Sequence, residues 1–172
     1  NSIKNRIGLI HEDRRGHSLV INRSIKNNVV LPIIDSYVKK GLYDSKKENS
    51  DVNDKMRELN IKAVNNNQKV YQLSGGNQQK VVFAKSLIFN PEVFLCDEPT
   101  QAVDVMTRSE IHTLLRNKAA EGKAIVYVTS DLLEMLEIAD NILIMAKGRT
   151  HELIENNNID SKTILQYCYK ER

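Results

Sequence analysis

Short apolar runs and longer helix-like stretches alternate along most of the chain. The apolar runs lie at 7–10, 93–96, 124–129 and 141–146. Stretches with apolar side chains every three or four positions lie at 77–89, 107–120 and 132–138. Short apolar runs bounded by polar residues are typical of buried strands, and the wider spacing is typical of helices. The alternation predicts an α/β fold on a parallel sheet, in which the second run is a strand buried on both faces and the third run is a further buried strand, too apolar to face water.

The segment 24–70 has a mostly polar, helical pattern that predicts a small helical subdomain. A second helix within it is expected at about 51–59. The polar stretch 45–54 before it is expected to be a loop or the start of that helix. Near the other end of the chain, Lys147-Gly148 predicts a turn into a short strand, and 160–170 is expected to form a closing helix.

Composition is that of an ordinary globular protein. Of the 172 residues, 41% are hydrophobic and 27% charged, and the basic residues behind the net charge of +3 are scattered. That pattern is typical of a solvated surface and not of a nucleic-acid interface. No apolar run approaches the ~18 residues needed to cross a bilayer, and no signal peptide opens the chain, so membrane association is expected through a partner. Cys96 and Cys168 are not spaced as a set of metal ligands, and nothing in the sequence suggests a disulfide framework. This use of cysteine favours a reducing cytoplasm.

The strongest chemical signal is a small-residue turn that leads into a helix. The turn has the sequence Leu73-Ser74-Gly75-Gly76-Asn77-Gln78. Its glycines leave backbone N–H groups open, and the following helix would direct its unpaired N–H groups and positive dipole end at an anion. Further on, the strand at 93–96 runs into Asp97 and Glu98, at the end where open α/β sheets place their ligands. Pro99-Thr100 and then Asp104 follow.

These motifs resemble the nucleotide-binding domain of ABC (ATP-binding cassette) transporters, whose signature motif, Walker B motif and D-loop occur in this order. The resemblance implies an α/β, partial P-loop NTPase fold, with a helical signature subdomain inserted into a parallel sheet. It also implies four segments. These are 1–23 with the first strand and a Q-loop-like segment, 24–76 with the helical subdomain and signature, 77–150 with the Walker B, D-loop and switch core, and 151–172 as a C-terminal tail.

A Walker A motif, G-x-x-x-x-G-K-[ST], does not occur in the sequence. The Gly122-Lys123 pair fails the pattern, because Asn117 stands at the first glycine and Ala124 follows the lysine. In the family that loop precedes everything in this chain, so the chain is expected to be the later two-thirds of a domain. Alone it is expected to be inactive and to bind ATP weakly. The family's P-loop strand lies inside the sheet, so the isolated chain is also expected to self-associate or rearrange.

By resemblance, each motif residue has a role in ATP hydrolysis. Asp97 would hold Mg²⁺, through water, and Glu98 would be the general base for the attacking water. In the family two such domains meet head to tail, and each ATP lies between the P-loop of one and the signature of the other. The signature residues expected at the nucleotide are Leu73, Ser74, Gly75, Gly76, Asn77 and Gln78. Asp104 would couple the two sites, and it can also cap the helix that follows it.

Two positions depart from the common family pattern. The switch position, a phosphate-contacting histidine in many members, is Ser130, whose hydroxyl is shorter and cannot become cationic. The Q-loop-like position is Glu12, in the run Glu12-Asp13-Arg14, where a glutamine is usual. Together with the signature, these features resemble the second ATPase half of monosaccharide importers of the ribose and galactose type, in which two cassettes are fused in one polypeptide.

The leading expectation is an energy-coupling ATPase of a sugar importer, using ATP and Mg²⁺ at the cytoplasmic face of the cell membrane. Its expected partners are a second nucleotide-binding domain, transmembrane permease subunits and, indirectly, a sugar-binding protein, with no nucleic acid. Two alternatives stay open: a degenerate, non-catalytic cassette that serves as scaffold and signature donor, and a nucleoside importer. A DNA-repair or chromosome ATPase is disfavoured, because the sequence has no long heptad-patterned coiled coil before the signature.

Overall fold

The computed structural model describes residues 2–146, 148–157 and 159–169. The chain forms two compact units, Asn1–Val128 and Thr129–Arg172, and each is described by itself. Among the residues described, no helix is both long and apolar enough to cross a membrane.

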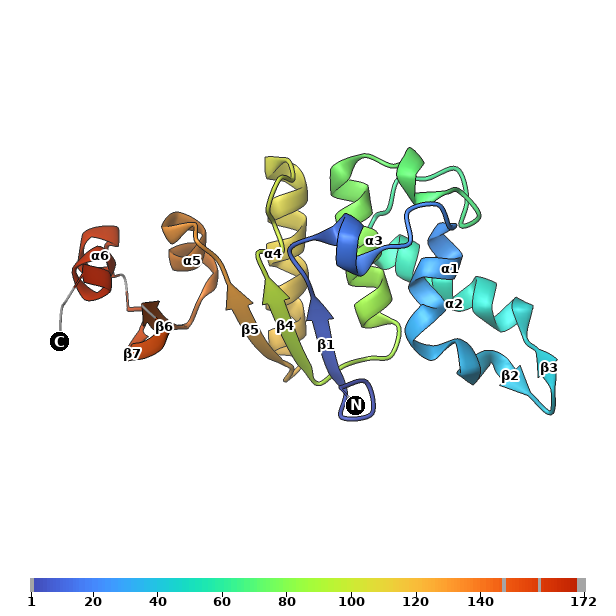
Figure 1. The fold of residues 1–172 in the computed structure, drawn as a ribbon, viewed down its shortest axis with the longest axis horizontal. Helices are drawn as coiled ribbons and strands as arrows, with labels where there is room; N and C mark the ends of the chain where they lie inside the picture. The colour runs from blue at the N-terminus through green and yellow to red at the C-terminus, as the bar shows by residue number, and fades with distance from the viewer. Residues whose placement is uncertain (1, 147, 158, 170–172) are drawn as a thin grey trace. The chain divides into compact units, whose positions relative to one another are not determined.

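A three-stranded parallel sheet forms the centre of the first unit (Figure 1). Its strands are β1 (Ile7–Ile10), β4 (Val93–Asp97) and β5 (Ala124–Val128), in the spatial order β1-β4-β5. The central strand β4 pairs in parallel with both neighbours, and Gly8 lies opposite Phe94. The predicted α/β class with a parallel sheet is confirmed. Because the strands are parallel, their carboxyl ends meet at one edge of the sheet.

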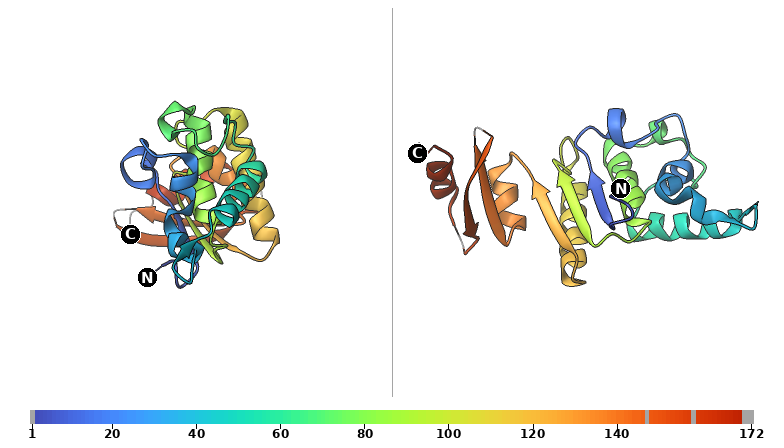
Figure 2. Two further views of the ribbon diagram at one scale, coloured as in Figure 1. Left: turned by 90° about the vertical axis from the view of Figure 1, so that its right-hand side faces the viewer. Right: turned by 60° about the horizontal axis from the view of Figure 1, so that its bottom comes forward.

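One face of this sheet is covered by helices and the other is exposed. Helices α3 (Gly75–Leu87) and α4 (Val105–Ala120) lie on one face (Figures 1 and 2), where Phe94 and Cys96 are buried. On the other face the exposed apolar side chains are Leu9 at 58%, Leu95 at 38%, Val126 at 49% and Val128 at 52%. The predictions that β4 is buried on both faces and that β5 is too apolar to face water are therefore wrong. Successive side chains of a strand point to opposite faces, and among the described residues of the first unit α3 and α4 pack on one face.

The helical subdomain is present, but its elements differ in detail from those expected. In chain order they are α1 (Ile25–Val30), a 3₁₀ helix (Leu31–Tyr37), the hairpin strands β2 (Val38–Lys39) and β3 (Leu42–Tyr43), and α2 (Ser45–Glu58). The sequence did not predict the hairpin, and it placed the start of α2 near residue 51. The helix begins earlier because Asp44 caps it, accepting a hydrogen bond from the Lys47 amide at 2.9 Å. Lys47 and Asp51, one turn apart, also form an ion pair.

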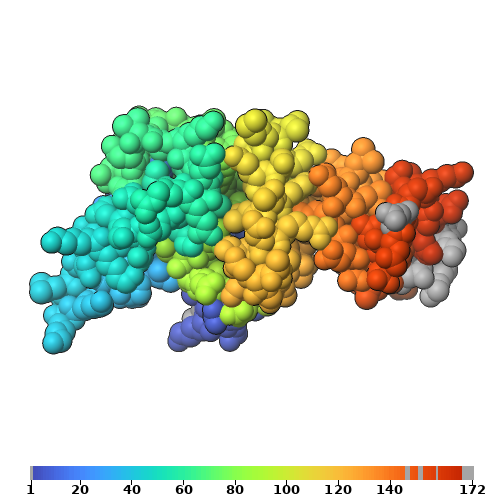
Figure 3. All heavy atoms as spheres, turned by 180° about the vertical axis from the view of Figure 1, so that it is seen from behind, coloured from blue at the N-terminus to red at the C-terminus, as the bar shows by residue number. Residues whose placement is uncertain are grey.

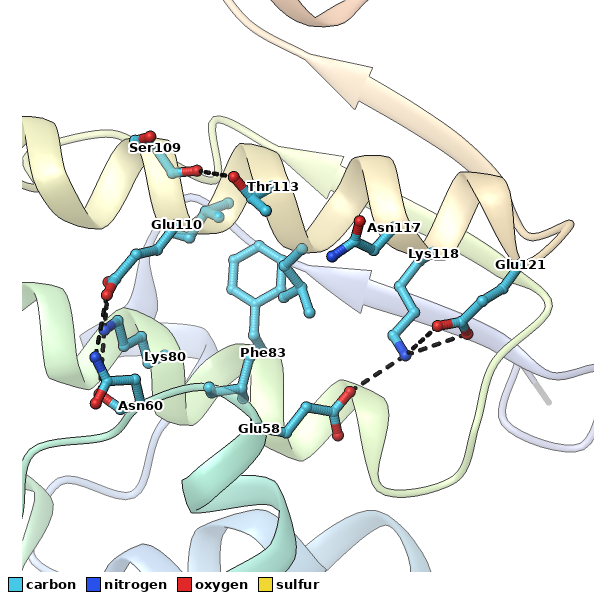
Figure 4. Close-up of a pocket in the computed structure, with 13 residues that line it drawn as sticks. Glu58, Asn60, Lys80, Phe83, Ser109, Glu110, Thr113, Asn117, Lys118 and Glu121 are labelled. Atoms are coloured by element: carbon cyan, nitrogen blue, oxygen red, sulfur yellow. Dashed lines mark hydrogen bonds and ion pairs between the residues drawn. The ribbon is translucent and has the colours of Figure 1, made fainter.

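Two ion pairs flank a cavity of about 430 Å³ that is lined by the end of α2, by α3 and by α4 (Figure 4). Lys118 Nζ lies 3.2 Å from Glu58 Oε1, and Lys80 Nζ lies 2.5 Å from Glu110 Oε2. A space-filling view of this side shows α4 over the sheet, beside the residues of α2 (Figure 3). The ion pairs therefore fasten α2 and α3 to α4.

We expect the stability of the first unit to depend on Glu58 in mild acid. Burial alone would raise the pKa of Glu58, but Lys55 and Lys118 outweigh it and hold the pKa below the ordinary value of 4.5. The stabilisation is therefore present above the unfolded pKa and is lost as the pH falls through the folded pKa. Urea unfolding between pH 6 and 3 should show a weaker pH dependence in Glu58→Gln than in the unaltered chain. An equal loss of pH dependence in the control Glu155→Gln, at an exposed residue of the second unit, would contradict this assignment.

The second unit is a small α/β arrangement with its own core. Its elements are α5 (Leu132–Ile138), β6 (Asn141–Ala146), β7 (Arg149–Glu155) and α6 (Ser161–Tyr169). The core is formed by Ile142, Ile144 and Ile164. The expectation that 141–146 joins the parallel sheet is wrong, because β6 pairs with β7 in an antiparallel hairpin. β7 also crosses the expected segment boundary after residue 150, while Lys147 and Lys170 lie outside the described residues.

Candidate functional site

The signature turn forms the N-terminus of α3. The sequence placed the helix start at Asn77, but Ser74 is the N-cap and both glycines belong to the first helical turn. Ser74 Oγ accepts hydrogen bonds from the Asn77 backbone amide at 3.4 Å and from Asn77 Nδ2 at 3.0 Å. Helix geometry leaves the amides of Gly75 and Gly76 without an intrahelical acceptor. Ser74 is exposed and Gly75 half-buried, so this end of the helix can face an anion, whereas Gly76 is buried.

Gln78 lies beneath the turn rather than on its surface. Its side chain is only 1% exposed, and its Nε2 donates to the carbonyl groups of Val70 at 3.2 Å and Leu73 at 3.1 Å. Its Oε1 accepts from Arg15 Nε at 3.3 Å. These contacts give Gln78 a supporting position that shapes the turn. A direct contact between Gln78 and phosphate, as the resemblance implies, would require some of these hydrogen bonds to break.

The two candidate carboxylates lie at the carboxyl end of the central strand. Asp97 is the last residue of β4, and Glu98 follows it with its amide bonded to the Val128 carbonyl at 2.9 Å. Glu98 has a φ of +41°, in the left-handed region that residues with a side chain rarely occupy. The Gln101 amide donates to the Glu98 carbonyl at 3.1 Å and closes a turn. Both carboxylates are half-buried, at an edge of the sheet suited to a ligand.

Asp104 caps α4, so the capping interpretation is confirmed. Its Oδ1 accepts from the Thr107 amide at 2.9 Å and its Oδ2 from Thr107 Oγ1 at 2.8 Å. These hydrogen bonds lower the pKa of Asp104. The cap also touches the signature, because a Cβ on Gly76 would lie 2.5 Å from Thr107 Oγ1 and 3.0 Å from Asp104 Oδ2. The D-loop and the signature therefore pack directly against each other within one chain.

Adding a methyl group at Gly76 should separate these two motifs. We expect Gly76→Ala to lower the free energy of unfolding by about 1–3 kcal/mol, the usual cost of overpacking a tight contact. Urea unfolding of the chain measures this loss. Removal of the Thr107 hydroxyl should relieve the clash, so Gly76→Ala with Thr107→Ala should cost less than the sum of the single variants. Additive costs would show that the contact is not the cause.

The segment after β1 contacts the signature and the D-loop through two arginines that were not among the predicted site residues. It forms a short π-helical turn, Arg14–Ser18, capped by Asp13, which accepts from the Arg15 and Gly16 amides. Arg14 donates to the carbonyl groups of Gln101 at 3.0 Å and Ala102 at 3.4 Å. Glu12, the residue that the sequence singled out, is exposed. The two adjacent arginines, Arg14 and Arg15, were the available signal, but sequence spacing does not indicate what they contact.

Ser130 belongs to the second unit. It is exposed and lies between Thr129, whose hydroxyl donates to Glu134 Oε2 at 3.0 Å, and Asp131, which caps α5. Asp131 Oδ1 accepts from the amides of Leu133 at 3.0 Å and Glu134 at 3.2 Å. These contacts anchor the residues on either side of Ser130 at the start of α5.

The carboxylates suit a magnesium ion that has few protein ligands. Within residues 2–146, 148–157 and 159–169, no group of three or more His, Cys, Asp or Glu side chains could enclose a metal. Mg²⁺ is commonly held by one or two carboxylates together with waters and substrate phosphates. Asp97 and Glu98 supply hard oxygen ligands of that kind. The open amides at the start of α3 fit a phosphate group, so both parts of Mg-ATP have suitable partners.

A family model described as "ABC transporter" matches residues 1–101 of the chain, more than half of its length. The chain belongs to the ABC transporter family. This result confirms the resemblance drawn from the signature, Walker B and D-loop motifs.

Similar proteins agree with this family and add detail. The ribose import ATP-binding protein of Cereibacter sphaeroides is 39% identical over 164 residues, which is 95% of this chain and 33% of the relative. That of Lactococcus lactis subsp. lactis is 39% identical over 165 residues, covering 96% and 34%. A putative ribose/galactose/methyl galactoside import ATP-binding protein of Halalkalibacterium halodurans is 36% identical over 168 residues, covering 98% and 32%. The chain thus spans about a third of the length of these relatives.

A solved structure has the same fold. It is the dimeric, post-hydrolysis state of the ATP-binding cassette MJ0796 bound to ADP and Pi, with a TM-score of 0.76 and 27% sequence identity. The similarity covers 91% of this chain and 66% of the other. The ABC ATPase fold is therefore shown by both sequence and structure.

Proposed function

We propose that the chain is part of an ATP-hydrolysing subunit that powers the import of a sugar. The observation that carries the proposal is the direct packing of the signature on the D-loop, through Gly76 and Asp104, in the unit that holds Asp97 and Glu98. That arrangement places an anion-binding helix N-terminus and a pair of carboxylates on one rigid framework. The sugar follows from the relatives, which are import ATP-binding proteins for ribose or galactose.

In this proposal each motif has one task. Asp97 would help to hold Mg²⁺, which would neutralise charge on the phosphates, and Glu98 would accept the proton of the attacking water. The ATP is bound head to tail between two cassettes, so the signature residues contact nucleotide held by the opposite cassette. Asp104 couples the two sites. The other two positions, Glu12 in the Q-loop-like segment and Ser130 at the switch, adjust the hydrolytic site.

The proposed partners follow from the same arrangement. A second nucleotide-binding domain completes the ATP site, and permease subunits hold the assembly at the cytoplasmic face of the membrane. A sugar-binding protein would act through the permease. The chain alone has a further proposed partner, a second copy of itself, because the exposed face of its sheet is apolar.

A non-catalytic scaffold is the second candidate function, and the residue at position 130 favours it. Serine cannot place a cation at the phosphate, so the site with this chain's carboxylates would hydrolyse ATP slowly or not at all. In that case the chain would donate its signature to an active partner site. A nucleoside is the alternative cargo to a sugar.

The test is a graft in which residues 2–169 of this chain replace the matching third of the Lactococcus lactis ribose import protein. ATP hydrolysis by the purified graft, and ribose uptake by cells whose own gene is deleted, would support the proposal. ATP binding without hydrolysis at this chain's carboxylates would favour the scaffold. Uptake of nucleosides but not of ribose would overturn the choice of cargo.

A further inference from the structure

Two consecutive arginines in the Q-loop-like segment connect it to the signature and to the D-loop, which are both far from it in the sequence. Arg14 Nη1 donates to the Gln101 carbonyl at 3.0 Å, and Arg14 Nη2 donates to the Ala102 carbonyl at 3.4 Å. The next residue, Arg15, donates to the side chain of Gln78 at 3.3 Å. The turn that follows β1 therefore contacts two motifs. Arg14 holds the backbone of Gln101 and Ala102, in the D-loop segment before Asp104, and Arg15 holds Gln78 of the signature.

The backbone that Arg14 holds has an unfavourable conformation. Ala102 has a φ of +52°, in the left-handed region that strains a residue with a Cβ. A guanidinium is planar and presents several N–H groups in a fixed fork, so it can hold two successive carbonyl groups at once. A lysine ammonium can also donate to a carbonyl, but it does not fix the geometry in the same way. Arg14 is therefore suited to stabilising this strained turn.

The same guanidinium lies against the signature helix. A Cβ on Gly75 would lie 3.2 Å from Arg14 Nη2 and 3.7 Å from the Ala102 carbonyl oxygen. The lack of a side chain at Gly75 lets the guanidinium lie close to both the first turn of α3 and the D-loop. Its positive charge also adds to the field at the N-terminus of α3, which favours an anion there.

We infer that Arg14 is a positioning residue for ATP hydrolysis, which holds the D-loop and the signature in one fixed arrangement. The inference rests on the proposed function. Arg14 is two residues from Glu12, so a displacement of the Q-loop-like segment would reach both motifs through the guanidinium. As a positioning residue, Arg14 acts without contacting nucleotide. It acts through the backbone of Gln101 and Ala102 and through the packing at Gly75.

Arg6 provides a matched control at the other end of β1. It donates from Nη2 to the Asn90 carbonyl at 2.9 Å and pairs with Glu92 at 2.6 Å, but it touches none of the motifs. In the graft, Arg14→Ala should lower kcat at least tenfold and change KM for ATP less than threefold, because the site binds nucleotide but is misaligned. Arg14→Lys should recover part of kcat. Arg6→Ala should leave kcat within twofold.

A second measurement uses the 172-residue chain itself and does not depend on hydrolysis. In Arg14→Ala, amide hydrogen exchange should become at least tenfold faster at Gln101 and Thr107, whose amides close the Glu98 turn and the α4 cap. Arg6→Ala should leave both rates unchanged. Two results would overturn the inference: unchanged amide hydrogen exchange at Gln101 and Thr107 in Arg14→Ala, or a kcat for the Arg14→Ala graft within twofold of that of the unaltered graft. An unaltered graft without ATPase activity would instead contradict the proposed function, and the exchange rates would still decide whether Arg14 holds the two motifs.

Discussion

Replacing Glu98 with glutamine is expected to lower ATP turnover at this chain's site at least ~100-fold, within the range that a general base contributes. The amide keeps the shape of the side chain but cannot accept the proton of the attacking water. Because Glu98 is half-buried at the end of β4, bulk water would be a poor substitute for it as a base. Nucleotide should remain bound, because Glu98 contributes to the proton transfer and not to the phosphate contacts.

The measurement is phosphate release by the graft, with hydrolysis at the other cassette blocked by a substitution of the same kind. Bound nucleotide is counted by filter binding with labelled ATP. Glu92→Gln serves as the matched control, since Glu92 precedes β4 and pairs with Arg6 and Lys123 away from the carboxyl end of the sheet. Turnover that is equal in Glu98→Gln and the unaltered graft would show that this site does not use Glu98, and would favour the scaffold.

The sequence predicted the parts of the site that depend on local chemistry. The structure has three predicted features of this kind: the strand that ends in Asp97, the turn of Ser74 and two glycines that leads into a helix, and the helix cap at Asp104. Each of them depends on neighbouring residues in the sequence. The positions of the helix starts were less accurate. Ser74 and Asp44 cap helices that begin before the apolar pattern does, because a cap is decided by one hydrogen-bonding side chain and not by periodicity.

Features that depend on tertiary pairing were beyond the sequence pattern. Arg14 contacts the D-loop across almost ninety residues of sequence, and nothing in its own neighbourhood specifies that partner. The run at 141–146 has the apolar character of a parallel strand, yet it pairs with the next strand in a hairpin. The apolar residues of β4 suggested burial on both faces and those of β5 a buried strand, but burial depends on which elements pack against the sheet.

The isolated chain is expected to self-associate through its three-stranded sheet. Leu9, Leu95, Val126 and Val128 expose apolar surface on one face. Among the described residues of the first unit, β5 is the last strand in the spatial order β1-β4-β5. An exposed apolar face on a sheet favours association with another chain. Light scattering should therefore give a mass well above the 19.6 kDa of one chain at micromolar concentrations.

Charge placed on the exposed face should reverse this association. Burial of an unpaired lysine charge against a second apolar face is costly, so Val126→Lys combined with Val128→Lys should shift the chain towards the monomer. Val64→Lys is the matched control, because Val64 is 88% exposed but lies outside the sheet, in the helical subdomain. The control should associate like the unaltered chain. If the unaltered chain is a monomer at every concentration, or if Val64→Lys dissociates it as well as the double variant, then the exposed face of the sheet does not hold the copies together.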